Sequence, residues 1–251
     1  MKNQLKTIAT KTLPVNLQRL LVRFLELTRR PPVGFVRFGD LRRIKPISQW
    51  YGFDRGLPID RYYIENFLTY QSNDIHGHVL EIGENSYTRK FGGERVTKSD
   101  VLHIEEGNPN ATIVGDLTQA DHIPSDSFDC FILTQTLQYL YDVRSGLQTI
   151  YRILKPGGVV LVTLSGINLL HDPYFRDSWH WAFTTASAQR LFEEVFPKTN
   201  VEVKTYGNAL AATAFVQGLA TQELRKKELD YCDPSYQVTI TVRAVKPNVT
   251  P

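Results

Sequence analysis

The sequence contains only two cysteines among its 251 residues, Cys130 and Cys232. Neither has a partner at metal-ligand or redox spacing, and Cys130 lies inside an apolar run, so we expect free thiols in a reducing compartment. Long hydrophobic runs are lacking too: Arg19 and Arg23 interrupt the apolar N-terminal stretch, and residues 209–220 are too short and too polar to span a bilayer. The sequence therefore predicts a cytoplasmic protein without a disulfide framework.

Internal repeats, low-complexity runs and clusters of metal-ligating residues are also absent from the sequence. The hydrophobic fraction of 42% and the charged fraction of 22% are those of a globular domain, which argues against a disordered or fibrous chain. The formal net charge of +3 is unevenly distributed, because residues 1–45 sum to +9 and the remainder to −6. An acidic body argues against nucleic acid as a substrate.

Residues 1–45 are thus predicted to be a basic N-terminal extension, followed by a domain over residues 46–251. Five apolar side chains of the extension share one helical face: Leu17, Leu20, Leu21, Phe24 and Leu25. A basic amphipathic helix of this kind packs on its own domain, contacts a partner protein or lies on an anionic membrane surface. The sequence leaves these alternatives open.

Asp60 precedes an apolar stripe at helical spacing and is predicted to cap the helix that follows. The loop before it, residues 50–59, is rich in aromatic residues and glycine. Such a loop either reaches over a binding site or holds the helix in place.

Short apolar runs predict five buried strands, at residues 78–82, 101–104, 111–114, 128–133 and 159–164. Between the last two, Asp142 caps a predicted helix that Lys155-Pro-Gly-Gly158 ends, which makes a βαβ unit and indicates a parallel sheet. The second and third strands are joined by a link too short for the usual helical crossover.

The loop at residues 165–184 and a further helix at 186–196 precede a strand at residues 201–206. Residues 236–244 then alternate apolar and polar side chains, which is typical of a half-exposed antiparallel strand.

With these segments in order, residues 78–246 resemble the class I S-adenosylmethionine-dependent methyltransferases, in particular the type 11 methyltransferase domain. The resemblance rests on the order and spacing of four segments: Val79-Leu-Glu-Ile-Gly, Gly115-Asp-Leu, residues 128–139, and Leu154-Lys-Pro-Gly-Gly. It implies an α/β, Rossmann-like fold with a mostly parallel seven-stranded sheet, an antiparallel final strand and helices on both faces. It also implies S-adenosylmethionine as the cofactor.

The same resemblance assigns cofactor-binding roles to residues at the strand ends. Glu81 and Gly83 match the turn beside the methionine part of the cofactor, and Glu105 matches the acid that accepts hydrogen bonds from the ribose hydroxyls. Asp116 matches the contact to the adenine amine, and Leu117 is its apolar neighbour. Carboxylates suit these roles because their hydrogen bonds to diol and amine donors are charge-assisted.

Thr134 and Gln135 match the tip of the fourth strand, beside both cofactor and acceptor. The sequence departs from the family pattern after Gly83, where Glu-Asn-Ser-Tyr replaces two further glycines. Tyr87 is therefore expected to fill space in a reshaped pocket.

Methyl transfer to an alcohol requires a base, and His171 and His180 are the candidates, in the loop after the fifth strand. The aromatic residues near Trp179 suit stacking on sugar rings and equally suit a packed lid. The first of these alternatives favours O-methylation of a small-molecule or glycan hydroxyl. The altered glycine motif leaves a second hypothesis, a degenerate methyltransferase fold that serves as a binding or scaffold module. A third hypothesis is an enzyme that reaches a carrier-bound or membrane-associated acceptor through residues 1–45.

Overall fold

The computed structural model describes residues 14, 17 and 31–248. Contacts within the chain divide it into two units, one on each side of the Ile44–Lys45 bond. The amphipathic helix predicted around Leu17–Leu25 lies largely outside the described residues. In the described part of the first unit, a 3-10 helix covers Gly39–Leu41, and most of the large apolar side chains are exposed, among them Val33, Phe35, Val36, Phe38 and Ile44.

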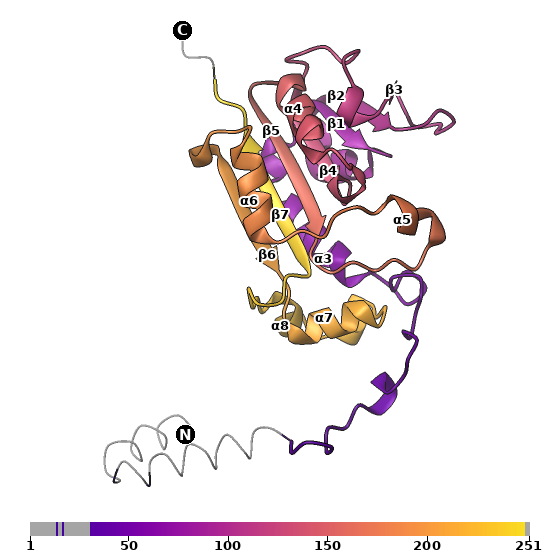
Figure 1. Ribbon diagram of the computed structural model, residues 1–251. Coiled ribbons are helices and arrows are strands. Elements are labelled where there is room, and N and C mark those ends of the chain that lie inside the picture. The colour runs from indigo at the N-terminus through magenta and orange to yellow at the C-terminus, as the bar shows by residue number, and fades with distance from the viewer. Residues whose placement is uncertain (1–13, 15–16, 18–30, 249–251) are drawn as a thin grey trace. The chain divides into compact units, whose positions relative to one another are not determined.

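The second unit is built on a seven-stranded sheet in the order β3-β2-β1-β4-β5-β7-β6 (Figure 1). Only β7 runs antiparallel to its neighbours β5 and β6, and the other pairs are parallel. The predicted α/β fold with an antiparallel final strand is therefore confirmed. The strands are β1 Gly77–Ile82, β2 Val96–His103, β3 Ile113–Val114, β4 Phe128–Thr134, β5 Leu154–Ser165, β6 Val201–Tyr206 and β7 Thr239–Val245.

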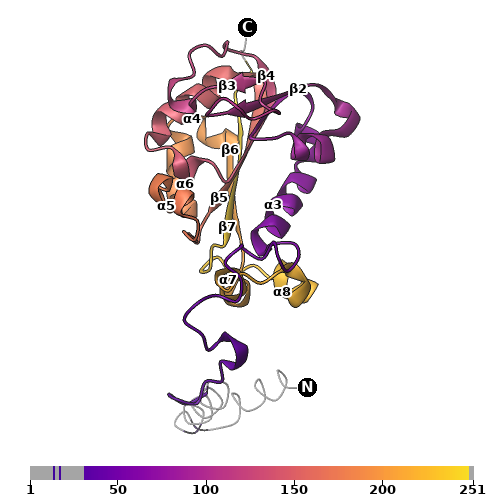
Figure 2. The same ribbon diagram turned by 90° about the vertical axis from the view of Figure 1, so that its right-hand side faces the viewer.

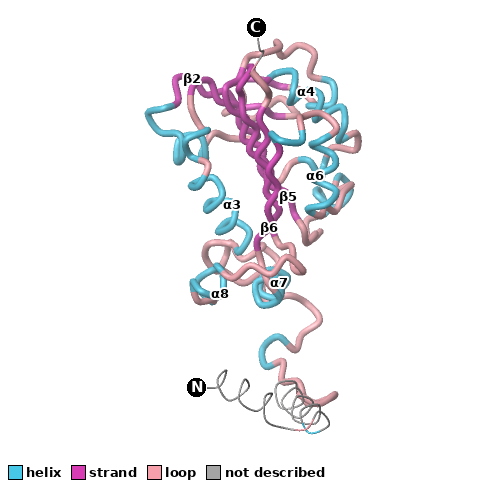
Figure 3. The backbone as a smooth tube through the Cα atoms, turned by 90° about the vertical axis from the view of Figure 1, so that its left-hand side faces the viewer, coloured by secondary structure: helices cyan, strands magenta, loops and turns pink. Residues whose placement is uncertain are grey.

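Helices cover both faces of the sheet (Figure 2). Helix α3 (Ile59–Tyr70) lies on one face, and α4 (Val143–Ile153) and α6 (Thr185–Glu193) lie on the other. Figure 3 shows the sheet edge-on between these layers, with α7 (Ala209–Val216) and α8 (Lys226–Asp230) beyond the end of the sheet where α3 begins. Strands β4 and β5 are buried on both faces, as their continuous apolar sequences predicted.

Two local predictions were wrong. Helix α3 begins at Ile59 after Pro58, and Asp60 lies in its first turn, where its carboxylate accepts a hydrogen bond from the Arg61 amide. A proline before the first turn is favourable there, because its φ angle is fixed and it leaves no amide without a partner. The segment predicted as a loop after β5 contains a short helix, α5 (Pro173–Ser178).

The connections around β2 are unusually short. After β1 a helical turn at residues 86–87 continues as a π-helix over Thr88–Gly92 and a 3-10 helix over Gly93–Arg95. Only turns and bends separate β2 from β3, as the short link predicted. The Asn108 side chain in that link donates to the carbonyl oxygen of Gly83 at 2.7 Å, so the two loops are joined at the end of the sheet.

Candidate functional site

The parallel strands β1 to β4 end on one edge of the sheet, and the predicted cofactor residues lie at or just beyond these ends. Because α3 runs back along the sheet before β1, its first turn lies at the same edge (Figure 1). Ligands of open α/β sheets bind at this edge, outside the carboxyl ends of the strands.

Glu81 anchors the loop that follows β1. Its side chain is buried, and its two carboxylate oxygens accept three hydrogen bonds, from the Thr88 amide and hydroxyl at 2.7 Å each and from the Tyr87 amide at 3.2 Å. Burial raises the pKa of Glu81 to about 7, against the lowering effect of these hydrogen bonds. The Glu81 carboxylate therefore fixes the conformation of the loop through these three hydrogen bonds.

Gly83 begins this loop with a φ of +79°, a left-handed conformation that favours glycine. No heavy atom lies within 4 Å of the position that a Cβ would take, so there is open space beside its backbone. The Tyr87 ring packs beside Phe91, with 5.9 Å between the ring centroids, and its hydroxyl accepts a hydrogen bond from Arg61 at 2.7 Å. The expectation that Tyr87 reshapes the cofactor pocket stays a prediction.

Arg61, in the first turn of α3, was missed by the sequence analysis. Its half-buried guanidinium lies 5.8 Å from the centre of the Phe53 ring and 6.0 Å from that of Tyr87. Among the described residues no carboxylate comes within ion-pair distance of it. A desolvated guanidinium whose hydrogen-bond partner is a phenol is suited to bind a carboxylate or another oxyanion. A single arginine among aromatic residues is too weak a sequence signal to reveal this.

The acids after β2 and β3 differ in their surroundings. The Glu105 side chain is exposed, and its amide donates to the ring of His103 at 3.2 Å, which fixes the backbone of the turn. Asp116 caps a 3-10 helix by accepting from the Thr118 amide at 2.8 Å. Leu117 is buried in the main core, so its side chain anchors this turn by packing against the core.

The tip of β4 has an unusual backbone. Gln135, which follows Thr134, has a φ of +49°, a conformation that residues other than glycine rarely adopt and that clusters at functional sites. Its amide donates to the Thr163 carbonyl at 2.9 Å, and its own carbonyl accepts from the side chain of Gln138 at 3.0 Å. Gln138 is completely buried and was not predicted as a site residue.

An aromatic shelf follows β4, made by residues 139–141 and 179–181. The rings of Tyr139 and Trp179 meet edge to face with 5.2 Å between centroids, and Tyr141 and His180 do so at 5.4 Å. The Trp181 indole donates to the Leu140 carbonyl at 2.8 Å. The shelf offers flat rings with polar edges, which suit a sugar or another ring-shaped acceptor.

The two predicted histidines contact different aromatic rings. His171 is half-buried and lies 5.5 Å, centroid to centroid, from Tyr51, which has a φ of +58° and donates to the Leu169 carbonyl at 3.2 Å. His180 is exposed beside Tyr141. Burial raises the pKa of Tyr51, and it raises that of Tyr139 to about 12, so both phenols stay neutral near physiological pH. Of the two histidines, His171 has the more enclosed position, which suits a base.

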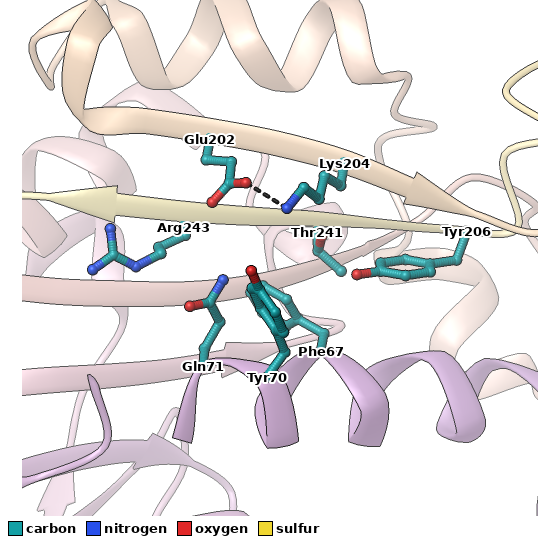
Figure 4. Close-up of a pocket in the computed structure, with 8 residues that line it drawn as sticks. All are labelled: Phe67, Tyr70, Gln71, Glu202, Lys204, Tyr206, Thr241 and Arg243. Carbon is teal, nitrogen blue, oxygen red and sulfur yellow. Dashed lines mark ion pairs between the residues drawn. The ribbon is translucent and has the colours of Figure 1, made fainter. Parts of the chain in front are cut away.

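A separate hollow lies between α3 and the strands β6 and β7 (Figure 4), with an empty volume of about 200 Å³ that includes open solvent. None of the predicted site residues lines it. All three of its charged residues are already paired, Lys204 with Glu202 at 2.5 Å and Arg243 with Asp74 at 2.7 Å. We therefore place the candidate site at the strand ends and not here.

The groups at the strand ends fit S-adenosylmethionine. Arg61 suits the carboxylate of the methionine part, the exposed Glu105 suits a ribose diol, and the second oxygen of Asp116 suits an amine. The open space beside Gly83 leaves room for a ligand against the backbone. Three of these four positions were predicted from the sequence.

Comparison with known proteins identifies the same segment. Residues 77–162 match the family model described as "Methyltransferase domain". Over 104 residues the chain is 27% identical to the ubiquinone/menaquinone biosynthesis C-methyltransferase of Pectobacterium atrosepticum. The matched part is 39% of this chain and 39% of that relative, so well under half of the relative is represented.

Two solved structures share the fold. An S-adenosylmethionine-dependent methyltransferase of Archaeoglobus fulgidus matches with a TM-score of 0.52 at 12% identity, over 74% of this chain and 94% of its own. A Galdieria sulphuraria protein proposed to be a sarcosine dimethylglycine methyltransferase also matches with a TM-score of 0.52, at 15% identity, over 75% of this chain and 87% of its own. Together these findings show similarity to methyltransferase domains over residues 77–162 and confirm the predicted fold.

Proposed function

We propose that the protein transfers a methyl group from S-adenosylmethionine to a hydroxyl of a sugar or another small molecule, and the match of residues 77–162 to the methyltransferase-domain family model supports this proposal. The observation that carries this proposal is that the end of β1, with Glu81, pairs beside β4, and that the tip of β4 leads directly into the aromatic shelf at the carboxyl edge of the sheet. In the proposed arrangement, cofactor and acceptor meet beside Gln135.

When bound, the cofactor supplies an activated methyl group, so the protein mainly has to align the acceptor and exclude water. We assign the methionine carboxylate to Arg61, the ribose hydroxyls to Glu105 and the adenine amine to Asp116. Glu81 keeps the loop after Gly83 in place through its three hydrogen bonds. None of these groups takes part in bond making; they orient the reacting carbon.

An alcohol acceptor must lose its proton during the transfer. We assign this step to His171, whose imidazole would accept the hydroxyl proton as the hydroxyl oxygen bonds to the methyl carbon, with the carbon–sulfur bond breaking and S-adenosylhomocysteine as the leaving group. The half-buried position of His171 beside Tyr51 supports the assignment. Stacking of the acceptor ring on Tyr139 and Trp179 would hold the hydroxyl in line with the methyl group.

The name of the curated relative records methylation at carbon. An electron-rich ring carbon is therefore the second acceptor class for a screen that begins with sugars, since the aromatic shelf would accept a planar ring equally well. Transfer to a ring carbon alone would overturn the hydroxyl assignment and leave the cofactor assignment intact.

Calorimetric titration with S-adenosylmethionine and S-adenosylhomocysteine tests the cofactor part of the proposal. We expect binding in the micromolar range, and Glu105→Gln should weaken it about ten- to a hundredfold through lost charge-assisted hydrogen bonds. Glu106→Gln is the matched control, because Glu106 is the adjacent exposed acid. A folded protein that binds neither compound would favour the scaffold hypothesis.

We further propose that residues 1–45 are a separate extension of a domain at residues 46–251 and contact an anionic lipid surface. Support comes from the described residues 31–45, which carry Arg37, Arg42, Arg43 and Lys45 among exposed apolar side chains. Cations interleaved with exposed apolar groups are typical of segments that lie at the membrane interface. In the part of the chain that the structure describes, no helix is long and apolar enough to cross a bilayer. The cytoplasmic location stays a prediction.

A further inference from the structure

Gln138 joins the two halves of the candidate site. Its side-chain amide nitrogen donates to the Gln135 carbonyl at 3.0 Å and lies 3.3 Å from the side-chain oxygen of Gln135. Its backbone carbonyl, on the other side, accepts from the His180 amide at 2.8 Å and from the Trp181 amide at 3.3 Å. One buried residue therefore holds both the strand tip beside the cofactor and the loop that completes the aromatic shelf.

The remaining contacts of residues 179–181 with this region fix them to residues 139–141. The Trp181 indole donates to Leu140, and the rings of Trp179 and His180 meet those of Tyr139 and Tyr141. The shelf is thus tied to the short helix at Leu137–Tyr139, to which Gln138 belongs. Besides the intervening backbone, the side chain of Gln138 connects Gln135 to this unit.

Two features of this joint are unusual. Gln135 has a φ of +49°, which is strained for a residue with a side chain. The side-chain oxygen of Gln138 is buried and has no hydrogen-bond partner among the described residues. Such backbone strain clusters at ligand sites and switch regions, and a ligand that contacts the strand tip differently in two arrangements would select between them.

We propose that Gln138 is a positioning residue that couples cofactor binding at the β4 tip to the position of the aromatic shelf. This inference rests on the proposed function, since it requires the cofactor to contact Gln135. Its consequence is ordered binding: the shelf takes the geometry that accepts the second substrate only after the cofactor is in place. Gln138 touches neither substrate itself, because its side chain is fully buried.

The chain offers a direct readout, because two of its three tryptophans, Trp179 and Trp181, are in the shelf and the third is Trp50. In a full-length Trp50→Phe background, tryptophan emission reports on the shelf alone. We expect saturation with S-adenosylhomocysteine to shift this emission and to change its quenching by acrylamide. The cofactor product is a suitable probe because it requires no knowledge of the acceptor.

Gln138→Met in the same background tests the joint, because methionine is similar in length and cannot form these hydrogen bonds. We expect the affinity for S-adenosylhomocysteine, measured by calorimetry, to stay within about twofold, while most of the emission change is lost. Gln189→Met on α6 is the matched control and should retain both. Gln138→Asn, which keeps an amide but no longer reaches Gln135, provides the same test if the methionine variant does not fold.

Each outcome of these experiments leads to a different conclusion. An unchanged emission response in the Gln138 variants would overturn the coupling. Loss of S-adenosylhomocysteine binding by folded Gln138 variants would overturn it as well, because Gln138 would then belong to the cofactor site itself. If the unmodified chain fails to bind S-adenosylhomocysteine in the calorimeter, the proposed function fails first, and the coupling that rests on it fails with it.

Discussion

Two charged groups withdrawn from water, Glu81 and Arg61, define the chemistry of the sheet edge at the scale of single residues. Glu81 is buried at the end of β1, where its hydrogen bonds shape the loop after Gly83. Arg61 lies across that loop and is held by the hydroxyl of Tyr87. The buried Glu81 carboxyl fixes the conformation of the loop, whereas the Arg61 cation beside it is available to a ligand. A substitution of Glu81 should therefore change stability, and one of Arg61 should change ligand affinity.

The raised pKa of Glu81, about 7 in the folded protein, predicts a pH-dependent stability. A carboxyl whose folded pKa lies above its unfolded value contributes stability that is full at low pH and is lost as pH rises through the folded value. Between about pH 5.5 and pH 8 the protein should therefore lose up to about 2 kcal/mol of unfolding free energy from this group. Glu81→Gln should remove that part of the slope in denaturant titrations at the two pH values. An identical slope in the variant would contradict the prediction.

Arg61→Gln should weaken binding of S-adenosylhomocysteine about ten- to a hundredfold, because it removes charge-assisted hydrogen bonds to the carboxylate. Methylthioadenosine keeps the nucleoside but has no carboxylate, so its affinity should be nearly the same for both proteins. Calorimetry with the two ligands distinguishes this role from a structural one. Equal weakening for both ligands would mean that Arg61 acts only by holding the loop after β1.

At the scale of elements, segments distant in sequence are bound to one another near His171. The loop at residues 48–58 is bound to residues 217–223: the Thr221 amide donates to the Leu57 carbonyl at 2.8 Å, and Arg55 forms an ion pair with Glu223. The residue after the end of β5, Gly166, also lies close to Gln237, just before the start of β7. These contacts fix the two sides of the edge on which the acceptor would bind.

Gly166, just after β5, shows how close this approach is. A Cβ at this position would lie 1.8 Å from the carbonyl oxygen of Gln237, so Gly166→Ala should force the backbones apart and cost about 1–3 kcal/mol of stability. Gly146→Ala in α4 is the matched control: its Cβ would meet only the flexible end of Leu140 at 2.8 Å, and alanine favours the helix. Thermal unfolding of both variants is the measurement. Equal changes in stability for the two variants would mean that the backbone at the end of β5 shifts to admit the methyl group at little cost.

At the scale of the whole molecule, the extension and the body carry net charges of opposite sign. Residues 1–45 sum to +9 and the remaining residues to −6. An anionic surface therefore attracts the extension and repels the body. This distribution orients the protein on such a surface without requiring any particular structure of the extension.

Replacing Arg37, Arg42 and Arg43 together by glutamine should reduce binding to vesicles of mixed phosphatidylglycerol and phosphatidylcholine. Each cation near an anionic surface contributes about 1 kcal/mol, so the expected loss is roughly a hundredfold, and added salt should weaken binding of the unmodified protein. A variant with Lys198, Arg225 and Lys227 replaced is the matched control, since these are exposed cations of the body. Equal loss in the control, measured by sedimentation with vesicles, would contradict the role of the extension.

Local sequence was sufficient to predict much of this protein. Continuous apolar runs predicted the buried strands, since a parallel strand covered on both faces excludes polar residues, and β6 was predicted with its bounds. The alternation in the last strand predicted β7 as antiparallel. Asp142 was predicted to cap α4 and does so, accepting from the Ser145 amide at 3.1 Å, because a cap depends on only four residues. The cofactor roles of the strand-end acids Glu105 and Asp116 came from the family resemblance and stay predictions.

The tertiary structure alone decided which residues meet. Arg61 became a candidate ligand only because α3 packs back along the sheet and brings its first turn to the loop after β1. Gln138 has no distinguishing pattern in the sequence, and its importance comes from contacts with residues before and far after it. His171 and His180 are close in the sequence but contact different rings. Burial, charge pairing and coupling depend on contacts between distant segments, and these exist only when the chain has folded.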